Sequence, residues 1–279
     1  MPGLSREAIA FYEEHGYYAP IRVLSPQRAA ALCGKLEAYE VGQASVEGGL
    51  RNKSHLLFTW LDELIRDENI LDAVESVLGQ NILCWGSSFF IKDARSPAFV
   101  SWHQDSTYWG LDPADIVTAW VAISESVLEN GAMRVIPGTH KKEQLAHHDT
   151  FGENNLLSRG QEIAVEVNEG DARSLVLQPG EMSLHHVRLV HGSEPNPSGC
   201  RRIGFAIRYL PTSVRQTAGM TDAATLVRGV DTFGHFLPEQ RPHHDLSSSA
   251  IAHHAEITGA TKTILMRGAR SSYGYVVSD

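Results

Sequence analysis

From residue 81 to residue 210 the sequence consists of short apolar runs separated by turn residues. The runs are rich in β-branched and aromatic residues, and the breaks contain Pro, Gly or Asn, as in Gln178-Pro179-Gly180. There is no βαβ alternation and no glycine-rich phosphate loop. About eight short strands at this spacing predict an all-β barrel or sandwich. The predicted strands are Ile82–Lys92, Ala98–Gln104, Ile116–Ile123, Met133–Ile136, Glu162–Val167, Ser174–Leu177, Met182–Val187 and Arg202–Leu210.

The first 80 residues predict helices that flank this β region. Residues 4–15 predict a helix with an apolar side and Ser5 as its cap, and Tyr17–Val23 predicts a short strand. Ser25-Pro26 is a typical helix start, and the helix Asp67–Leu78 ends at a glycine. Residues 216–259 lack a sustained hydrophobic period. A lid over the barrel mouth and a set of irregular helices are both compatible with them. Residues 261–278 are expected to form a frayed tail. We expect one mainly β domain over 1–279, with helices in 1–80, the β core in 81–212 and a covering segment in 213–279.

Composition and charge exclude several classes of partner. The net charge of -9 and the pI of about 5.8 argue against nucleic acid or an anionic membrane. No apolar run approaches the roughly 20 residues that span a bilayer, and the N-terminus lacks the layout of a signal peptide. The three cysteines are widely spaced and form no zinc motif, so we expect reduced thiols in a cytoplasmic protein.

His103 and Asp105 lie two residues apart at the end of a predicted strand. Side chains at i and i+2 of a strand point to the same face, so this imidazole and carboxylate can occupy two positions of one metal ion. Two histidines and one carboxylate form the facial arrangement of non-haem Fe(II) oxygenases. A His-x-Asp pair alone is common by chance, so a third ligand is needed from a distant strand. The candidates are His140, His147, His148, His185, His186 and His191.

Among these histidines, His191 stands out because of the residues that follow it. Gly192 and Ser193 are small and permit another group to approach the His191 side chain closely. Arg202 lies eleven positions after His191, across a Pro/Gly turn. The arginine is expected on the adjoining antiparallel strand, deep in the same cavity. A buried arginine needs an anion, and its planar fork fits a carboxylate bidentately. A metal with open positions beside such a clamp is what 2-oxoglutarate requires.

These residues match the His-x-Asp…His-x10-Arg pattern of Fe(II)/2-oxoglutarate oxygenases, and the chain resembles the phytanoyl-CoA dioxygenase family in particular. The resemblance covers about residues 5–212 and implies a double-stranded β-helix, a jelly-roll of eight strands, in agreement with the strand pattern. The segments that carry it are WHQD at 102–105, AW at 119–120, NGAMRVIPGTHK at 130–141, QPGEMSLHH at 178–186, HGS at 191–193 and RRIGFAIRY at 201–209.

The resemblance also implies cofactors and roles. The chemistry would use Fe(II), 2-oxoglutarate and O2, with ascorbate as a helpful reductant, and would release succinate and CO2. Because Asp105 is present where halogenating relatives have a small residue, hydroxylation or another oxidation is favoured over halogenation. The implied iron ligands are His103, Asp105 and His191; Arg202 and Ser193 would bind the far carboxylate of 2-oxoglutarate, Trp120 would pack beside it, and Ser88 matches more loosely as a polar neighbour.

The sequence defines the substrate-binding residues less sharply than the iron ligands. Arg208 would meet either an anionic substrate or a surface carboxylate, whereas Lys92 is expected at a solvated strand end. His243, His244, His253 and His254 are expected in solvent rather than on a second metal. The candidate substrate residues are Gln104, Thr107, Tyr108, Trp109, Arg208, Asn52 and His55; packing or a loop position would explain several of them equally well.

The cavity arginines favour a small polar or anionic metabolite as the substrate. The same chemistry on a larger natural product or acyl chain is an alternative. A non-oxygenase metal protein on a cupin-like barrel, such as an isomerase or a sensor, is another, and Arg202 argues against it.

Overall fold

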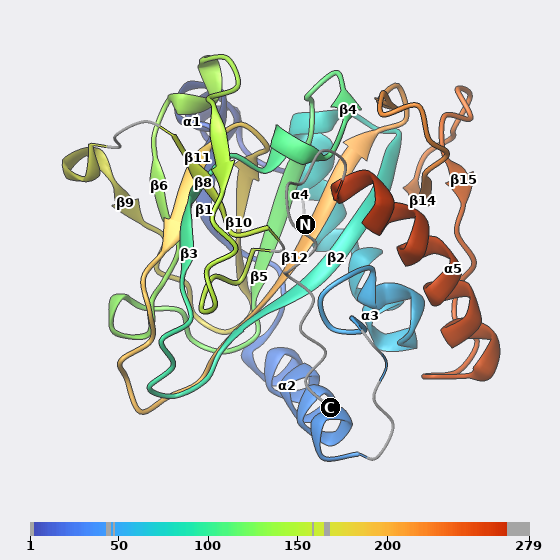
Figure 1. Ribbon diagram of the computed structural model, residues 1–279, viewed down its shortest axis with the longest axis horizontal. Coiled ribbons are helices and arrows are strands. Elements are labelled where there is room, and N and C mark those ends of the chain that lie inside the picture. Colours follow the sequence, from blue (N-terminus) through green and yellow to red (C-terminus); the bar gives the residue numbers. More distant parts are fainter. Residues whose placement is uncertain (1–2, 43–45, 47, 158, 165–167, 267–279) are drawn as a thin grey trace.

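The computed structural model describes residues 3–42, 46, 48–157, 159–164 and 168–266. Its β region is a seven-stranded sheet, in the order β1-β10-β5-β12-β2-β14-β15, and a four-stranded sheet, in the order β3-β11-β6-β9 (Figure 1). The cavity described below is lined from both sheets, which is the arrangement of a jelly-roll. The mainly β fold with a double-stranded β-helix core is therefore confirmed.

The strands of the large sheet are β1 (Tyr17–Arg22), β10 (Glu181–His186), β5 (Val117–Ala122), β12 (Arg202–Pro211), β2 (Ile82–Lys92), β14 (Ala223–Arg228) and β15 (Leu237–Pro238). Those of the small sheet are β3 (Val100–His103), β11 (Val190–Ser193), β6 (Arg134–Ile136) and β9 (Arg173–Ser174). Two short ribbons pair β4 (Leu111–Asp112) with β13 (Arg215–Gln216), and β7 (His147–Asp149) with β8 (Gln161–Ile163).

The helices begin where the sequence supplies capping side chains. Ser5, Ser25 and Asp67 each accept hydrogen bonds from the backbone of the first helical turn that follows. The α-helices are α1 (Arg6–His15), α2 (Pro26–Val41), α3 (Thr59–Ile65), α4 (Glu68–Leu78) and α5 (Ser248–Leu265), with short 3-10 turns η1 (Ser54–Leu56), η2 (Asp105–Tyr108), η3 (Leu128–Asn130), η4 (Thr139–Lys141) and η5 (Glu169–Asp171).

On strand β12, residues that face the apolar core alternate with residues that face the cavity. The odd-numbered residues 203–209 are buried in the main apolar core. In that core they meet apolar residues of α3 and α4, such as Leu61 and Val74. Each buried apolar side chain contributes about 1.5–3 kcal/mol, so the outer face holds the fold together. The even-numbered residues Arg202, Ala206 and Arg208 face the cavity between the sheets.

The short strand expected at residues 17–23 is present as β1, which pairs with β10 at the sheet edge. Two other regions differ from the sequence-based expectation. Residues 223–228 are not an irregular cover; as β14 they pair with β2. Residues 248–265 form the regular helix α5, so the frayed tail expected from 261 is wrong as far as Leu265. Residues 165–167 and 267–279 lie outside the described residues.

A buried polar cluster attaches the C-terminal segment to the loop before α3. Lys53 Nζ donates to Glu239 Oε1 at 2.6 Å and to the Ala223 carbonyl at 2.9 Å. His55 lies 3.1 Å from Glu239 Oε2 through Nε2. The side chains of all three ionisable residues are at most 1% exposed. Burial opposes ionisation of Glu239, but Lys53 and His55 outweigh it and lower the pKa of Glu239 to about 2.

Replacing Glu239 with glutamine is expected to lower the free energy of unfolding by about 3–5 kcal/mol, because Lys53 would keep a buried charge without its partner. The folded pKa of Glu239 lies below its ordinary value, so its contribution is present above about pH 4.5 and is lost as the pH falls toward 2. Urea unfolding at pH 7 and at low pH measures both effects. The same change at the exposed Glu256 of α5 is the control and should have little effect.

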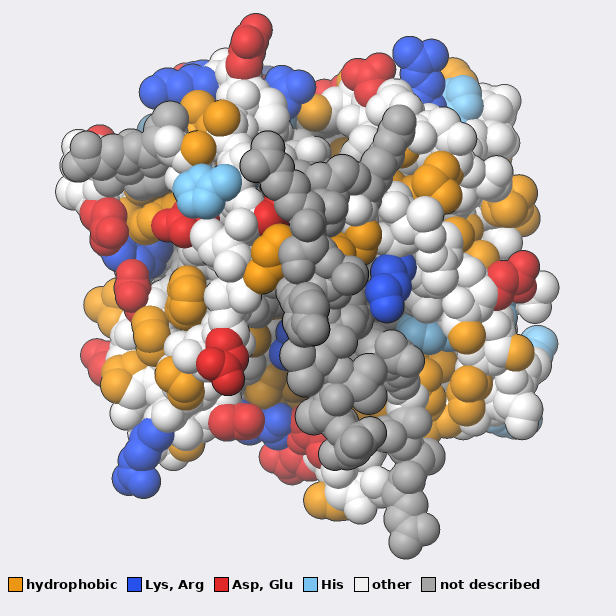
Figure 2. Space-filling model, viewed as in Figure 1, with side chains coloured by type: hydrophobic (Ala, Val, Ile, Leu, Met, Phe, Trp, Pro, Cys, Tyr) orange, Lys and Arg blue, Asp and Glu red, His pale blue; other side chains and the backbone are white. Residues whose placement is uncertain are grey.

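The surface mixes acidic, basic and apolar side chains, and no single kind dominates the face in Figure 2. Among the described residues, no helix combines the length and the apolar character needed to cross a membrane.

Candidate active site

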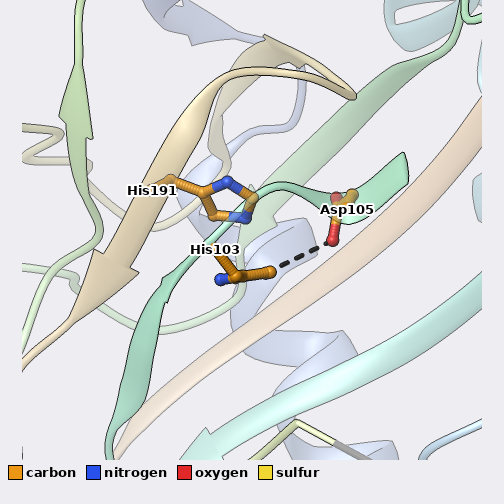
Figure 3. A group of neighbouring side chains, drawn as sticks. All are labelled: His103, Asp105 and His191. Carbon is orange, nitrogen blue, oxygen red and sulfur yellow. Dashed lines mark ion pairs between the residues drawn. The ribbon is translucent and has the colours of Figure 1, made fainter. Parts of the chain in front are cut away.

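His103, Asp105 and His191 converge between the two sheets (Figure 3). His103 ends β3, Asp105 opens η2 two residues later, and His191 lies on β11 directly opposite His103 in the strand pairing. One ligand atom from each residue lies within 4.8 Å of the other two. The sequence spacing therefore predicts this convergence correctly, and the cross-strand pair supplies the third residue.

Backbone contacts orient both imidazoles for metal binding. The Nδ1 atoms of His103 and His191 lie 2.9 Å from the carbonyl oxygens of Ser101 and Leu189. A carbonyl oxygen can only accept a hydrogen bond, so each Nδ1 carries a proton and Nε2 is the nitrogen left to bind a metal. Metal-binding histidines are oriented in this way by their second nitrogen.

The charges at the three side chains suit a metal cation. Burial lowers the pKa of His191 well below its ordinary value, with His103 acting in the same direction, so His191 is neutral. Burial alone would raise the pKa of Asp105, but its contacts with His103 and His191 lower it below the ordinary range. His103 Nε2 lies 3.4 Å from Asp105 Oδ1. Two imidazole nitrogens and one carboxylate match the donor set of Fe(II) oxygenases.

One end of the cavity is closed by two basic residues. Arg202 on β12 lies directly opposite Lys92 on β2, and both are almost fully buried. Lys92 Nζ donates to Ser193 Oγ at 2.6 Å and to the Glu194 carbonyl. The solvated position expected for Lys92 is therefore wrong. Burial, followed by the neighbouring charge of Arg202, lowers the pKa of Lys92 to about 6.

Arg202 keeps hydrogen-bond donors available in this closed end. Its Nη1 donates to the Gly131 carbonyl, while its buried Nε has no partner among the described residues. No ion pair joins Arg202 or Lys92 to a carboxylate in the described part of the chain. A buried charge without an opposite charge beside it is costly, so this end of the cavity suits an anion that comes from outside.

Trp120 forms a wall beside Arg202. The guanidinium carbon of Arg202 lies 5.4 Å from the centre of the Trp120 ring. Gly204 makes room for this ring, because a Cβ at that position would lie 1.8 Å from Trp120 Cζ2. The outer neighbours Val117, Ala119 and Val121 are packed in the core, so β5 has the two faces that its alternation predicts.

Arg208 lies at the opposite end of the cavity from Arg202. Its Nη1 donates to Ser88 Oγ, and its guanidinium lies over Phe90 and Trp109 at 5.8 and 5.9 Å from the ring centres. Ser88 was expected near 2-oxoglutarate, but its contact is with Arg208. Arg208 is half-buried, and burial lowers the pKa of its guanidinium.

These residues lie in a segment that matches a known protein family. The profile of the phytanoyl-CoA dioxygenase (PhyH) family matches residues 12–204, which include every residue of the converging group and Arg202. The chain belongs to the phytanoyl-CoA dioxygenase family.

The names of two relatives of this chain refer to different substrates. The chain is 37% identical over 159 residues, 56% of its length, to a "probable alpha-ketoglutarate-dependent hypophosphite dioxygenase" of Stutzerimonas stutzeri, covering 54% of that protein. It is 33% identical over 132 residues, 46% of its length, to the human "phytanoyl-CoA dioxygenase, peroxisomal", covering 39%. The chain thus spans about half the length of the curated relatives it matches.

Solved structures cover more of the chain. The non-heme monooxygenase ThoJ in its apo form is similar with a TM-score of 0.83 and 33% identity, over 92% of this chain and 97% of that one. CytC3 with Fe(II) and alpha-ketoglutarate, another name for 2-oxoglutarate, is similar with a TM-score of 0.67 and 25% identity, over 88% and 96%.

Several predicted substrate residues of this PhyH-family chain do not line the cavity. Gln104 instead binds the Arg188 carbonyl and the Leu145 amide, and Thr107 bonds to the Gln104 carbonyl. Trp109 packs on Trp85 at 4.9 Å between ring centres. His55 belongs to the Glu239 cluster, the Asn52 carbonyl lies 2.8 Å from His254 Nε2, and the side chain of Tyr108 is outside the described residues.

His254 is also a correction, because it is 1% exposed and not in solvent. His185 was a candidate metal ligand in the sequence, and the structure places it in the cavity wall instead. Strand alternation was an available signal for Thr118, which shares a face of β5 with Trp120. The residues that line the cavity without having been predicted are Phe90, Val100, Thr118 and Met133.

Proposed function

We propose that this chain is an Fe(II)- and 2-oxoglutarate-dependent dioxygenase that hydroxylates an unactivated C–H bond of a small polar or anionic metabolite. The observation that carries the proposal is the joint position of two residue sets in one cavity. The His103–Asp105–His191 group offers a metal three donors, and Arg202 at the closed end has no ion-pair partner among the described residues.

The residues present fit both cofactors. His103, Asp105 and His191 would hold Fe(II) and leave positions for the cosubstrates. Arg202 would pair with the far carboxylate of 2-oxoglutarate. Ser193 already accepts a hydrogen bond from Lys92, so its own hydroxyl proton is free to donate to the same carboxylate.

The remaining cavity residues exclude water and hold the reactants in place. Phe90, Val100, Trp120 and Met133 make part of the wall apolar, and positioning by such walls is the main contribution of the protein in cofactor chemistry. When bound, Fe(II) and 2-oxoglutarate supply the oxidation. One oxygen atom of O2 enters succinate as 2-oxoglutarate loses CO2, and the other enters the alcohol product.

A small polar substrate is favoured by two observations. The name of the Stutzerimonas relative contains hypophosphite, a very small oxyanion. The cavity lining includes Arg208, Thr118 and His185, which suit a polar or anionic molecule better than a long acyl chain.

A succinate assay tests the proposed function. The protein is incubated with Fe(II), ascorbate, 2-oxoglutarate and O2 against a panel of carboxylates, phosphonates, hypophosphite and acyl-CoA esters, with metal-free protein as the control. Succinate formation that needs iron and one of the small oxyanions is the expected result. If neither succinate nor 2-oxoglutarate-dependent O2 uptake occurs with any compound, the chain is a cupin-like metal protein instead.

A further inference from the structure

A row of three polar side chains crosses the inner face of the large sheet at the end opposite Arg202. Arg208 on β12 is paired with Thr118 on β5, and Thr118 is paired with His185 on β10. All three line the cavity. Neighbouring strands lie about 4.8 Å apart, so the three residues form one continuous surface.

This row lies next to the metal-binding group. Thr118 Oγ1 is 3.5 Å from Asp105 Oδ2, and the His185 ring centre is 4.8 Å from that of His191. A molecule bound to the row is therefore adjacent to the residues that would hold iron.

Two buried nitrogens in the row have no partner among the described residues. They are Arg208 Nε and His185 Nδ1, and His185 is only 2% exposed. Buried polar atoms are nearly always paired in folded proteins, so exceptions call for a ligand or another functional explanation. Together with the Thr118 hydroxyl, they offer several polar contacts to one small group.

Among the described residues, Arg208 forms no ion pair; Ser88 and two aromatic rings hold it in place. The carboxylate whose charge acts on it is Asp105, and that charge would be taken by the metal. With Fe(II), Asp105, the two arginines and doubly charged 2-oxoglutarate in place, one positive charge remains even if Lys92 is neutral.

The two arginines are held by different contacts. Arg202 and Arg208 are six residues apart on one strand, which places their Cα atoms about 20 Å apart. The Arg202 guanidinium is held by the Gly131 carbonyl, and the Arg208 guanidinium by Ser88 and Trp109. A carboxylate bound at Arg202 therefore leaves Arg208 available to a second anion.

We propose that Arg208, Thr118 and His185 bind the negatively charged group of the substrate. The substrate class is then a small carboxylate, phosphonate or phosphinate whose oxidised hydrogen lies one or two bonds from that group, because the row borders Asp105. This assignment rests on the proposed function, since it takes the Arg202 end for 2-oxoglutarate.

Calorimetry without O2 tests the site separately from turnover. Protein loaded with Fe(II) and 2-oxoglutarate is titrated with methylphosphonate, acetate or hypophosphite, and with acetamide as the neutral counterpart of acetate. We expect at least one oxyanion to bind and acetamide not to bind. Arg208→Gln should weaken the oxyanion at least about tenfold, the loss of a charged hydrogen bond, while 2-oxoglutarate affinity stays within about twofold.

Two further variants make the result interpretable. Arg215→Gln removes the same charge from an exposed arginine, 64% exposed, and should leave oxyanion binding unchanged. Thr118→Val should weaken the oxyanion while retaining 2-oxoglutarate. The assignment is overturned if no oxyanion binds the loaded wild type, if Arg208→Gln binds it normally, or if Arg208→Gln loses 2-oxoglutarate as well. Failure of the wild type to bind Fe(II) or 2-oxoglutarate would instead refute the proposed function.

Discussion

An Asp105→Ala variant, like His103→Ala, is expected to form no measurable succinate from 2-oxoglutarate. Each change removes one of three converging ligand atoms. Loss of a second-layer partner alone typically costs 10–100-fold in metal affinity or activity, so loss of a ligand should cost at least about a hundredfold. Succinate formation and the iron bound per protein molecule are the measurements.

The control for this prediction is His148→Ala. His148 lies on β7, and its side chain is 56% exposed, so iron content and turnover should match the wild type. Turnover within about tenfold of the wild type in Asp105→Ala and His103→Ala, at normal iron content, would show that the metal binds elsewhere.

An Arg202→Gln variant is expected to raise the KM for 2-oxoglutarate strongly while the protein still binds iron. Truncating one partner of a buried charge pair costs about 2–5 kcal/mol, which corresponds to about thirtyfold up to several thousandfold in affinity. Arg202→Lys should recover only part of this, because an ammonium cannot bind a carboxylate with two parallel hydrogen bonds. Steady-state kinetics with varied 2-oxoglutarate measure the effect.

The preceding residue provides a matched control. Arg201 points outward and pairs with Glu40 and Asp93 on the surface, where such pairs contribute about 0–1 kcal/mol. Arg201→Gln should therefore leave the KM for 2-oxoglutarate unchanged. An equal effect of the two substitutions would mean that strand β12 was disturbed and that Arg202 has no special role.

Local patterns made much of the fold and the iron-site geometry predictable. The i, i+2 spacing of His103 and Asp105 puts them on one side, and alternation along β12 separates Arg202 and Arg208 from the core-facing residues between them. Turn residues located the strands of the jelly-roll, since Pro, Gly and Asn have direct backbone preferences.

Contacts between distant segments were not predictable in this way. Lys92 appears solvated from its position at a strand end, but β11 covers it through Ser193 and Glu194. His254 is buried only because α5 returns to the loop at Asn52. Gln104 and Thr107 adjoin the metal motif in sequence, yet they turn toward the 144–147 segment. Such outcomes depend on which segments meet, and a single sequence carries little information about that.

Strand β12 also fixes the spacing between Arg202 and Arg208. Its pairing with β2 is regular from Arg202 to Arg208 and its pairing with β5 from Gly204 to Tyr209, and the irregularity with β2 comes between Arg208 and Tyr209. A single inserted residue between the arginines would turn one of them into the helix-covered core, because side chains alternate with a period of two. The spacing between the two charges can therefore change only in steps of two residues. Relatives that accept substrates of other sizes are expected to differ in the surrounding loops, with this strand left at the same length.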